Sequence, residues 1–329
     1  MPTVYHEYDD VFIVPRYSMI ASRSEVSTRS ILKSCHSNFT AELEVPMISS
    51  NMDTVTEYEM CHAMARGGGV GAIHRFLSIE RAIEEYKNSP SASFVSIGVN
   101  RDTHERTDAL YEAGARFFIV DIAHGHTMMM KNLLTRLRTR YNRDIFVMAG
   151  NVGTPQAVTD LENWGADAIK VGIGGGFVCE TKNVTGVNTP MFTTLQLCAS
   201  ATDQPVIADG GARAYGDVAK AIGAGAAAVM SGYFFAGCPE TPSRSRVYDP
   251  VTNTETTIYR GMASRDAMNV IRSENTMPTP EGRSTVAKTK PSAVVVMQEI
   301  AGGLRSAYSY VGAKNTCEFQ SKVEFGYRR

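Results

Sequence analysis

The chain has 329 residues, of which 43% are hydrophobic and 20% charged, and its formal net charge is −1. This balance predicts a globular protein with a large core and argues against disorder or a nucleic-acid-binding surface. No apolar run reaches the length of a membrane helix, and the start of the chain, MPTVYHEYDDVF, is too acidic for a signal peptide. We therefore expect a cytoplasmic protein. The six cysteines form no CxxC pair, so they indicate neither a zinc site nor a disulfide framework.

Short apolar, β-branched runs recur along the chain, and each is typical of a strand covered on both faces. Eight such runs lie at 46–50, 69–75, 94–99, 117–122, 145–150, 168–173, 205–210 and 227–232. Helices are predicted between them at 56–66, 79–88, 104–113, 127–140, 155–164, 191–201 and 214–223. The alternation indicates an α/β protein. Eight strand–helix units favour a single (β/α)8 TIM barrel, with an open doubly wound sheet as the alternative.

Residues 238–290 interrupt this pattern after the eighth strand. They are rich in Pro, Thr, Ser and Arg with little helical periodicity, and the closing helix is predicted only at about 291–312. A long insertion on a barrel is typical of a lid over the active face. Because the composition does not shift enough for a second domain, we predict one TIM-barrel domain over 1–329. Its irregular flap is expected at about 238–290.

The loops that follow the strands are the place to search for a site, since barrel enzymes build theirs there. Polar residues and glycines follow five of the predicted strands, at 51–54, 121–126, 174–181, 209–211 and 232–233. Glycines after the sixth, seventh and eighth strands allow backbone N–H groups to approach a phosphate. Asp209 is suited to accept hydrogen bonds from a ribose diol, although an aspartate before two glycines is equally typical of a simple turn.

Cys179 stands in one of these glycine-rich loops rather than in an apolar run. Solvent access and backbone N–H dipoles in such a loop favour the thiolate, which is the reactive form. Thr181 follows two residues later and is placed to relay a proton if a carboxylate lies behind it. The alternative is a surface cysteine without a role.

Several segments resemble the IMP dehydrogenase/GMP reductase family, and they occur in order over nearly the whole chain. GNVGTPQAVTDLENWGADAIKVGIGGGFVCETKNVTGV at 150–187 resembles the catalytic segment of the family. The others are YDDVFIVP (8–15), SRSEV (22–26), PMISSNMDTV (46–55), VIADGGARAYGDVAKAIGAGA (206–226), YRGMAS (259–264) and GGLRSAYSYVGA (302–313). The resemblance implies a (β/α)8 barrel in which a cysteine thiolate attacks C2 of a purine.

Within the family the chain looks most like the GMP reductases. It has no insertion of the size of a CBS pair, and the stretch from Met268 to Glu281 is short and lacks the Arg-Tyr pair of the dehydrogenase flap. DIAHGH and GNVGTP resemble a shorter bacterial branch of reductases. The resemblance therefore implies NADPH-dependent conversion of GMP to IMP and ammonia by a homotetramer.

The resemblance also implies roles for individual residues. The catalytic residues would be the nucleophile Cys179 and the relay Thr181 and Glu281. The nucleotide would contact Asp209, Gly210, Gly211, Gly232, Tyr233, Gly261, Met262, Ala263 and Gly282. The cofactor NADPH would contact Ser22, Arg23, Asp53, Arg75, Asp121, Ile122, Ala123, Ser306, Ala307, Tyr308 and Ser309, some of them from a neighbouring subunit. A monovalent cation such as K⁺ would be held at Gly174, Gly176, Cys179 and Lys182. Arg23 and Arg75 are the candidates to recognise a 2′-phosphate, which favours NADPH over NADH.

The chain departs from the family pattern at three places. Pro278-Thr279-Pro280 stands where the reductases carry an Arg and a small polar residue, Tyr233 follows Gly232, and Gly175 replaces a proline. These departures leave a deoxynucleotide or a modified purine open as substrate. Three other functions remain open: an IMP dehydrogenase without CBS modules that uses NAD, a non-catalytic purine-nucleotide-binding barrel, and a flavin-dependent barrel.

Overall fold

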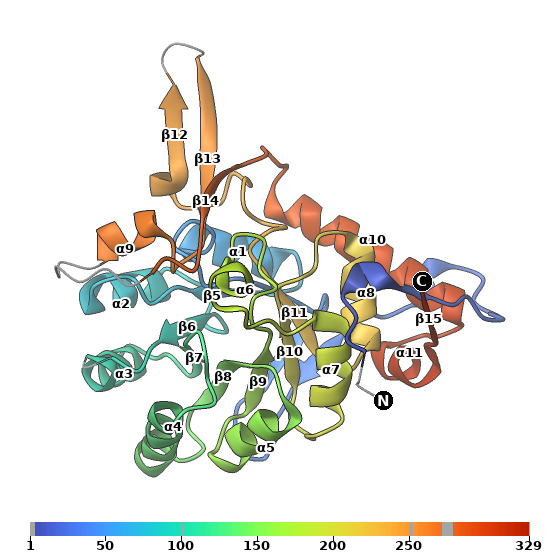
Figure 1. Ribbon diagram of the computed structural model, residues 1–329, viewed down its shortest axis with the longest axis horizontal. Coiled ribbons are helices and arrows are strands. Elements are labelled where there is room, and N and C mark those ends of the chain that lie inside the picture. The colour runs from blue at the N-terminus through green and yellow to red at the C-terminus, as the bar shows by residue number, and fades with distance from the viewer. Residues whose placement is uncertain (1–3, 101, 250–252, 272–278, 329) are drawn as a thin grey trace.

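The computed structural model describes residues 4–100, 102–249, 253–271 and 279–328. Its centre is a closed barrel of parallel strands in the order β10-β11-β4-β5-β6-β7-β8-β9 (Figure 1). The strands are β4 (Met47–Ser49), β5 (Val70–Ile73), β6 (Phe94–Ile97), β7 (Phe117–Asp121), β8 (Phe146–Val152), β9 (Ala168–Val171), β10 (Val206–Asp209) and β11 (Ala228–Ser231). Each lies within one of the eight predicted runs, apart from the last residues of β8. Closure of the sheet confirms the barrel and excludes the open doubly wound alternative.

Helices cover the outside of the barrel, as predicted for parallel strands. They are α1 (Tyr58–Arg66), α2 (Ile79–Lys87), α3 (Thr103–Glu112), α4 (Met128–Tyr141), α5 (Pro155–Asn163), α7 (Met191–Ala199), α8 (Tyr215–Gly223) and α10 (Ala293–Val311). The sequence did not predict the short α6 (Thr181–Thr185) or α11 (Thr316–Lys322). None of the described helices is long and apolar enough to cross a membrane.

A hairpin closes the amino-terminal end of the barrel. It consists of β2 (Ser30–Leu32) and β3 (Ala41–Leu43). Leu32 and Leu43 belong to the same buried cluster as the inward-facing aromatic rings at the start of β6, β7 and β8. This end of the barrel is therefore filled with apolar side chains.

The described part of the flap contains regular elements that the sequence did not predict. Instead of irregular chain, it contains an antiparallel sheet of β12 (Arg246–Asp249), β13 (Thr254–Arg260) and β14 (Ser284–Ala287), with the helix α9 (Arg265–Ile271) between the last two strands. In Figure 1 the β12–β13 hairpin stands out from the barrel. The expectation of an irregular flap is thus corrected. The Thr, Tyr and Val content of these short strands suits a sheet, but β14 pairs with a strand far away in the sequence.

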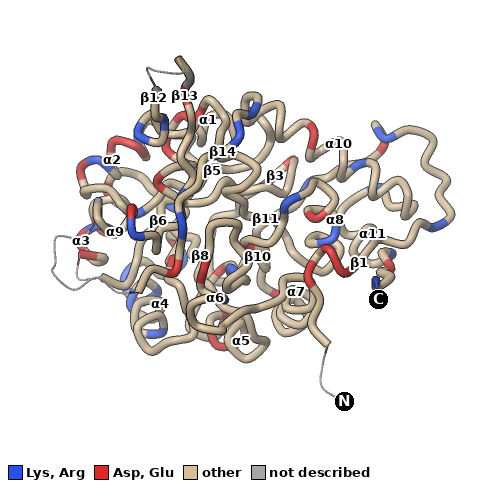
Figure 2. The backbone as a smooth tube through the Cα atoms, turned by 45° about the horizontal axis from the view of Figure 1, so that its top comes forward, with Lys and Arg blue, Asp and Glu red and all other residues tan. Residues whose placement is uncertain are grey.

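Near the ends of the chain, β1 (Val11–Ile13) pairs with β15 (Phe325–Tyr327), which joins the two ends on one side of the barrel. Two short 3₁₀ helices, Tyr8–Asp10 and Arg23–Glu25, also lie in the amino-terminal segment. Figure 2 shows acidic and basic residues spread over many elements of the described chain. This spread agrees with the formal net charge of −1.

Candidate active site

The loops at the carboxyl ends of the barrel strands surround a cavity of about 940 Å³. Its walls come from the flap segments 261–263 and 281–282, from residues that follow β5 and β6, and from the loops after β4, β7, β9, β10 and β11. These are the loops in which the sequence placed polar residues and glycines. The cavity lies where TIM-barrel enzymes carry their active sites.

The loop after β9 brings a thiol, a hydroxyl and a carboxylate into one hydrogen-bonded row. The Cys179 thiol donates to Thr181 Oγ1 over 3.3 Å, and the Thr181 hydroxyl donates to Glu281 Oε2 over 2.9 Å. Glu281 comes from the flap, 100 residues further along the chain. The row forms a proton path from the sulfur to a carboxylate, as a nucleophile paired with a base requires.

Backbone contacts fix the two segments that carry this row. Glu180 N–H donates to the Glu281 carbonyl over 2.7 Å, and Arg283 N–H donates to the Val178 carbonyl over 2.9 Å. A β-bridge also joins Cys179 to Gly282. The flap segment therefore lies antiparallel to the nucleophile loop, so that the positions of Cys179 and Glu281 depend on each other.

In the cavity wall, Lys170 links two of the predicted binding residues. Its Nζ lies 2.8 Å from Asp121 Oδ1 and 2.5 Å from Asp209 Oδ2, and the residue is only 2% exposed. Burial alone would lower the pKa of Lys170, but the two carboxylates raise it above its ordinary value. Asn51 donates to Asp121 Oδ2, and Asn151 donates to Asp209 Oδ2. Lys170 and Asn151 thus both contact Oδ2 of Asp209 rather than its Oδ1.

Sequence reasoning did not identify Lys170, although the signal was present. A lysine in the middle of the apolar run AIKVGI needs either contact with solvent or buried partners. Because helices cover a barrel strand, the lysine is not exposed to solvent there and must have buried partners. The structure supplies two carboxylates as partners, one from β7 and one from β10.

Aromatic rings form the cavity wall beside the glycine loops. Among these aromatic residues, the sequence predicted a role only for Tyr233. The ring centroid of Phe177 lies 4.9 Å from that of Tyr233 and 6.3 Å from that of Tyr259. The Arg213 guanidinium lies 5.6 Å from the centre of the Phe177 ring and also lines the cavity. Gly210 and Gly211 adopt φ values of +93° and +81°, a region that disfavours side chains.

The structure places the other predicted nucleotide and cofactor residues in different surroundings. The residues Arg75, Asp121, Ile122, Ala123, Gly232, Gly261, Met262, Ala263 and Gly282 line the cavity. Asp53 is 2% exposed and forms an ion pair with Arg260. Ser22 and Arg23 lie in the amino-terminal segment and are not among the residues that line this cavity.

The segment 306–309 lies on α10, away from the cavity walls. Tyr308 is fully buried and stacks on Phe319 with ring centroids 4.2 Å apart, so its side chain belongs to the core. Ser306, Ala307 and Ser309 are partly exposed. The position of this segment therefore does not support contact with a cofactor bound in the cavity of the same chain.

The loop predicted to hold a monovalent cation is tightly turned. Gly174 has φ +82°, and Gly176 accepts a hydrogen bond from Cys179 N–H over 3.1 Å. Lys182 is exposed on α6. Pro278, one of the three departures from the family pattern, lies outside the described residues, while the neighbouring Thr279 lines the cavity.

Comparisons with known proteins agree with this geometry. A GMP reductase from Acidovorax sp. (strain JS42) is 34% identical over 97% of this chain and 94% of its own length. The inosine-5′-monophosphate dehydrogenase of Cryptosporidium parvum is 33% identical over 97% of this chain and 90% of its own length. A crystal structure of a cysteine-to-alanine variant of Trypanosoma brucei GMP reductase in complex with guanosine 5′-monophosphate has a TM-score of 0.89 and 26% identity. The match covers 100% of this chain and 96% of the Trypanosoma brucei chain.

The comparison with families is more direct. The sequence profile described as "IMP dehydrogenase / GMP reductase domain" matches residues 5–328, which is nearly the entire chain. A match of this extent, together with a closed barrel and a thiol in the loop after its sixth strand, shows the family. The chain belongs to the IMP dehydrogenase/GMP reductase family.

Proposed function

We propose that this protein is a GMP reductase, an oxidoreductase that converts GMP, NADPH and two protons into IMP, NADP⁺ and an ammonium ion. The observation that carries the proposal is the row of Cys179, Thr181 and Glu281, in which each group is within hydrogen-bond distance of the next. Similarity to reductases from two bacterial genera, at 34% and 35% identity, supports the same assignment.

The row accounts for both proton transfers of the reaction. Cys179 gives its proton to Thr181 and Glu281, and the thiolate forms a bond to C2 of the purine. The C2 amino group then leaves as ammonia, taking its proton back from Thr181 with Glu281 behind it. The remaining thioimidate has an electrophilic C2. When bound, NADPH supplies the hydride to this carbon, and the C–S bond then breaks to release IMP and the thiolate.

The proposed nucleotide site uses the glycine loops and the aromatic wall. Asp209 Oδ1 would accept from the ribose hydroxyls, since its other oxygen is occupied by Lys170 and Asn151. The backbone at Gly210, Gly211 and Gly232 can approach a phosphate closely because no side chain intervenes. Arg213, stacked over Phe177, adds a positive charge to this wall.

The proposed cofactor site lies on the Asp121 side of the cavity. Arg75 lines the cavity, and its guanidinium lies 4.5 Å from the centre of the Phe76 ring. This cation is the candidate for the 2′-phosphate that distinguishes NADPH from NADH. The turn at Gly174, Gly176 and Cys179, with Lys182, would hold K⁺ through carbonyl oxygens. Higher turnover in K⁺ than in an equal concentration of Na⁺ would support this ion site.

A homotetramer is part of the proposal. Tyr17 and Met19 are 87% and 85% exposed on the segment that leads to Ser22 and Arg23. Large hydrophobic side chains on an extended segment are suited to contact another subunit. Such contact would carry Ser22 and Arg23 toward the cofactor site of a neighbour.

An IMP dehydrogenase is the second candidate, because a dehydrogenase is nearly as similar to the chain, at 33% identity, as the reductases are at 34% and 35%. The two are separated by assaying the purified protein with GMP and NADPH and, in parallel, with IMP and NAD. We expect loss of reduced-nicotinamide absorbance with GMP only. Formation of reduced nicotinamide from IMP and NAD, without reaction of GMP, would assign the dehydrogenase instead.

The nucleophile is tested by Cys179→Ala, with Cys317→Ala as the matched control because Cys317 is exposed at the start of α11. The first variant should lose several decades of turnover while still binding GMP, and the second should keep wild-type turnover. Substantial turnover in Cys179→Ala would exclude covalent catalysis. Turnover with neither substrate pair in wild-type protein would favour a non-catalytic nucleotide-binding barrel.

A further inference from the structure

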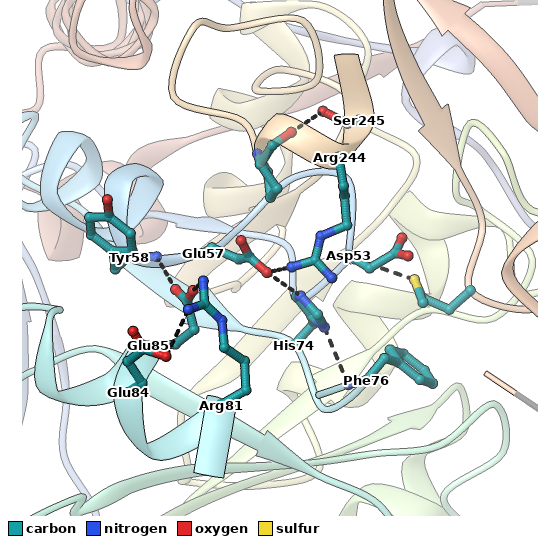
Figure 3. Close-up of polar contacts among 12 residues, drawn as sticks. Asp53, Glu57, Tyr58, His74, Phe76, Arg81, Glu84, Glu85, Arg244 and Ser245 are labelled. Atoms are coloured by element: carbon teal, nitrogen blue, oxygen red, sulfur yellow. Dashed lines mark hydrogen bonds and ion pairs between the residues drawn. The ribbon is translucent and has the colours of Figure 1, made fainter. Parts of the chain in front are cut away.

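Two arginines of the flap are paired with two carboxylates of the loop that follows β4. Arg260, at the end of β13, pairs with Asp53, and Arg244, just before β12, pairs with Glu57. Figure 3 shows the Arg244 side chain directed at Glu57, whose carboxylate also faces His74. The flap is thus attached to the barrel by charges as well as by its backbone.

The Asp53–Arg260 pair has the two-point geometry of a strong ion pair. Arg260 Nε lies 3.2 Å from Asp53 Oδ1, and a second guanidinium nitrogen contacts Oδ2. The side chains are only 3% and 14% exposed for Asp53 and Arg260. The backbone supports the contact, because Arg260 N–H donates to Thr54 Oγ1 over 3.4 Å and Asp53 N–H to Met262 Sδ over 3.4 Å.

The Glu57–Arg244 pair is held in place from the barrel side by His74. Phe76 N–H donates to His74 Nδ1 over 3.2 Å, so the ring proton lies on Nε2, which is 3.2 Å from Glu57 Oε1. Burial lowers the pKa of His74 to about 4, so the ring is neutral at pH 7. A neutral donor leaves the charge of Glu57 available to Arg244.

The path from Asp53 to the catalytic row is short and continuous. Arg260 is followed by residues 261–263, which line the cavity. The Ala263 carbonyl accepts hydrogen bonds from Glu281 N–H over 3.1 Å and from Gly282 N–H over 3.2 Å. Glu281 in turn accepts from Thr181. A shift of the 260–263 segment therefore moves the backbone that carries the relay carboxylate.

We propose that Asp53 is a positioning residue that holds the 260–263 segment through Arg260 and thereby keeps Glu281 in contact with Thr181. This differs from the sequence-based expectation that Asp53 contacts the cofactor. The inference rests on the proposed function only in so far as Glu281 moves protons in that reaction. Because the pair is buried, removing one charge leaves the other uncompensated, and the segment is expected to move.

The first experiment compares Asp53→Asn with Glu85→Gln. Glu85 is a matched control: it is 1% exposed, pairs with Arg81 and accepts from Tyr58 N–H, but it lies on α2, and neither of these contacts is with a described residue of the flap. We expect Asp53→Asn to lower kcat by about 10- to 100-fold, with the KM for GMP changed less than about threefold. Glu85→Gln should keep kcat. An Asp53→Asn variant with a raised KM for NADPH and an unchanged kcat would return Asp53 to the cofactor site and overturn the proposal.

A double-mutant comparison separates positioning from general damage. If Asp53 acts through Glu281, then Asp53→Asn combined with Glu281→Gln should be about as slow as Glu281→Gln alone. Rate losses that multiply would show that Asp53 acts independently of the relay, and would overturn the proposal. If Asp53→Asn does not fold, Arg260→Lys can replace it in the double-mutant comparison with Glu281→Gln. Lysine keeps the positive charge of Arg260 but cannot make the two-point contact with Asp53.

A measurement that needs no turnover distinguishes this inference from the proposed function. Hydrogen–deuterium exchange of the segments 256–264 and 281–287 should be at least tenfold faster in Asp53→Asn than in wild type and in Glu85→Gln. Unchanged exchange in these segments would overturn the anchor even if the protein reduces GMP. Faster exchange in a protein that does not reduce GMP would support the anchor and reject the proposed reaction.

Discussion

Glu281 contacts the nucleophile only through the Thr181 hydroxyl, and this indirect contact determines how its loss should appear. Glu281→Gln keeps the size of the side chain, so the fold and the affinity for GMP should be retained. Release of ammonia should slow by about 100-fold or more, the usual scale for losing a general acid–base partner. Hydride transfer needs no such relay. The reverse reaction of IMP with NADP⁺, measured up to the covalent intermediate, should therefore change much less.

Glu180→Gln is the control for this substitution. Glu180 is the neighbouring carboxylate in the nucleophile loop, but it pairs with Arg283 and Asn183 rather than with Thr181. Its turnover should stay within a few-fold of wild type. Equal slowing of both half-reactions in Glu281→Gln would mean that the carboxylate holds the flap instead of moving protons.

His74 makes the stability of the fold depend on pH. Burial lowers its pKa to about 4, whereas in the unfolded chain the pKa is about 6.5. The unfolded state therefore binds more protons between these values. The free energy of unfolding should fall as the pH is lowered from about 6.5 to about 4, by at most on the order of 3 kcal/mol. Denaturant titrations at several pH values across this window measure the slope.

Two histidine variants assign this slope. His74→Gln can still donate to Glu57 but has no ring to protonate, so its unfolding free energy should vary less with pH than that of wild type. His62→Gln removes an exposed histidine and should keep the wild-type slope. If both variants show the wild-type slope, the acid sensitivity has another source.

At the scale of elements, Gly237 lies where the chain enters the flap and is packed closely against the segment by which the chain leaves it. Gly237 has φ +91°, and a Cβ there would lie 2.1 Å from the Lys288 carbonyl oxygen. The Gly237 carbonyl also accepts from Lys290 N–H over 3.0 Å, where the chain returns from the flap. Gly237→Ala should therefore lower the free energy of unfolding by about 2 kcal/mol or more, through backbone strain and the clash together. Thermal or denaturant unfolding measures the change.

The same substitution elsewhere should have the opposite effect. Gly216 lies in α8, and nothing is within 4 Å of the position that its Cβ would take. Gly216→Ala should raise the free energy of unfolding by up to about 1 kcal/mol, because alanine restricts the unfolded chain and favours a helix. Similar stability of the two variants would show that Gly237 is not strained.

At the scale of the whole molecule, the exposed segment before Ser22 is expected to mediate assembly. Tyr17→Glu combined with Met19→Glu places charges on two side chains that are 87% and 85% exposed in the single chain. We expect light scattering to show a tetramer for the wild type and a smaller species for the double variant. The KM for NADPH should rise while the KM for GMP changes little, since Ser22 and Arg23 would no longer reach a neighbour.

Met128→Glu is the control for the assembly, because Met128 is 67% exposed at the start of α4 on another side of the barrel. Its mass and kinetics should match those of the wild type. A wild-type protein that is monomeric and fully active would reject both the tetramer and the shared cofactor site.

The sequence alone determined the barrel and the rim of loops that carries the site. Apolar runs of strand length, separated by amphipathic helices, define parallel strands, and the carboxyl ends of parallel barrel strands must meet at one face. Residues at the carboxyl ends of the strands, such as Asp121 and Asp209, or in the loops that follow them, such as Cys179, could therefore be assigned to one cavity. The contact between Cys179 and Thr181 is also local, because a single residue separates them in the chain.

Only the tertiary structure decided which charges meet. Lys170 is one polar residue in an apolar run, and its role emerged when β7 and β10 placed Asp121 and Asp209 beside it. Asp53 lies in a loop of the cavity rim, yet Arg260 from the flap occupies its carboxylate. Whether a carboxylate faces a ligand or a counter-charge depends on side chains brought in from more than 200 positions away. No local pattern of residues carries that information, because it arises from how the flap folds back over the barrel.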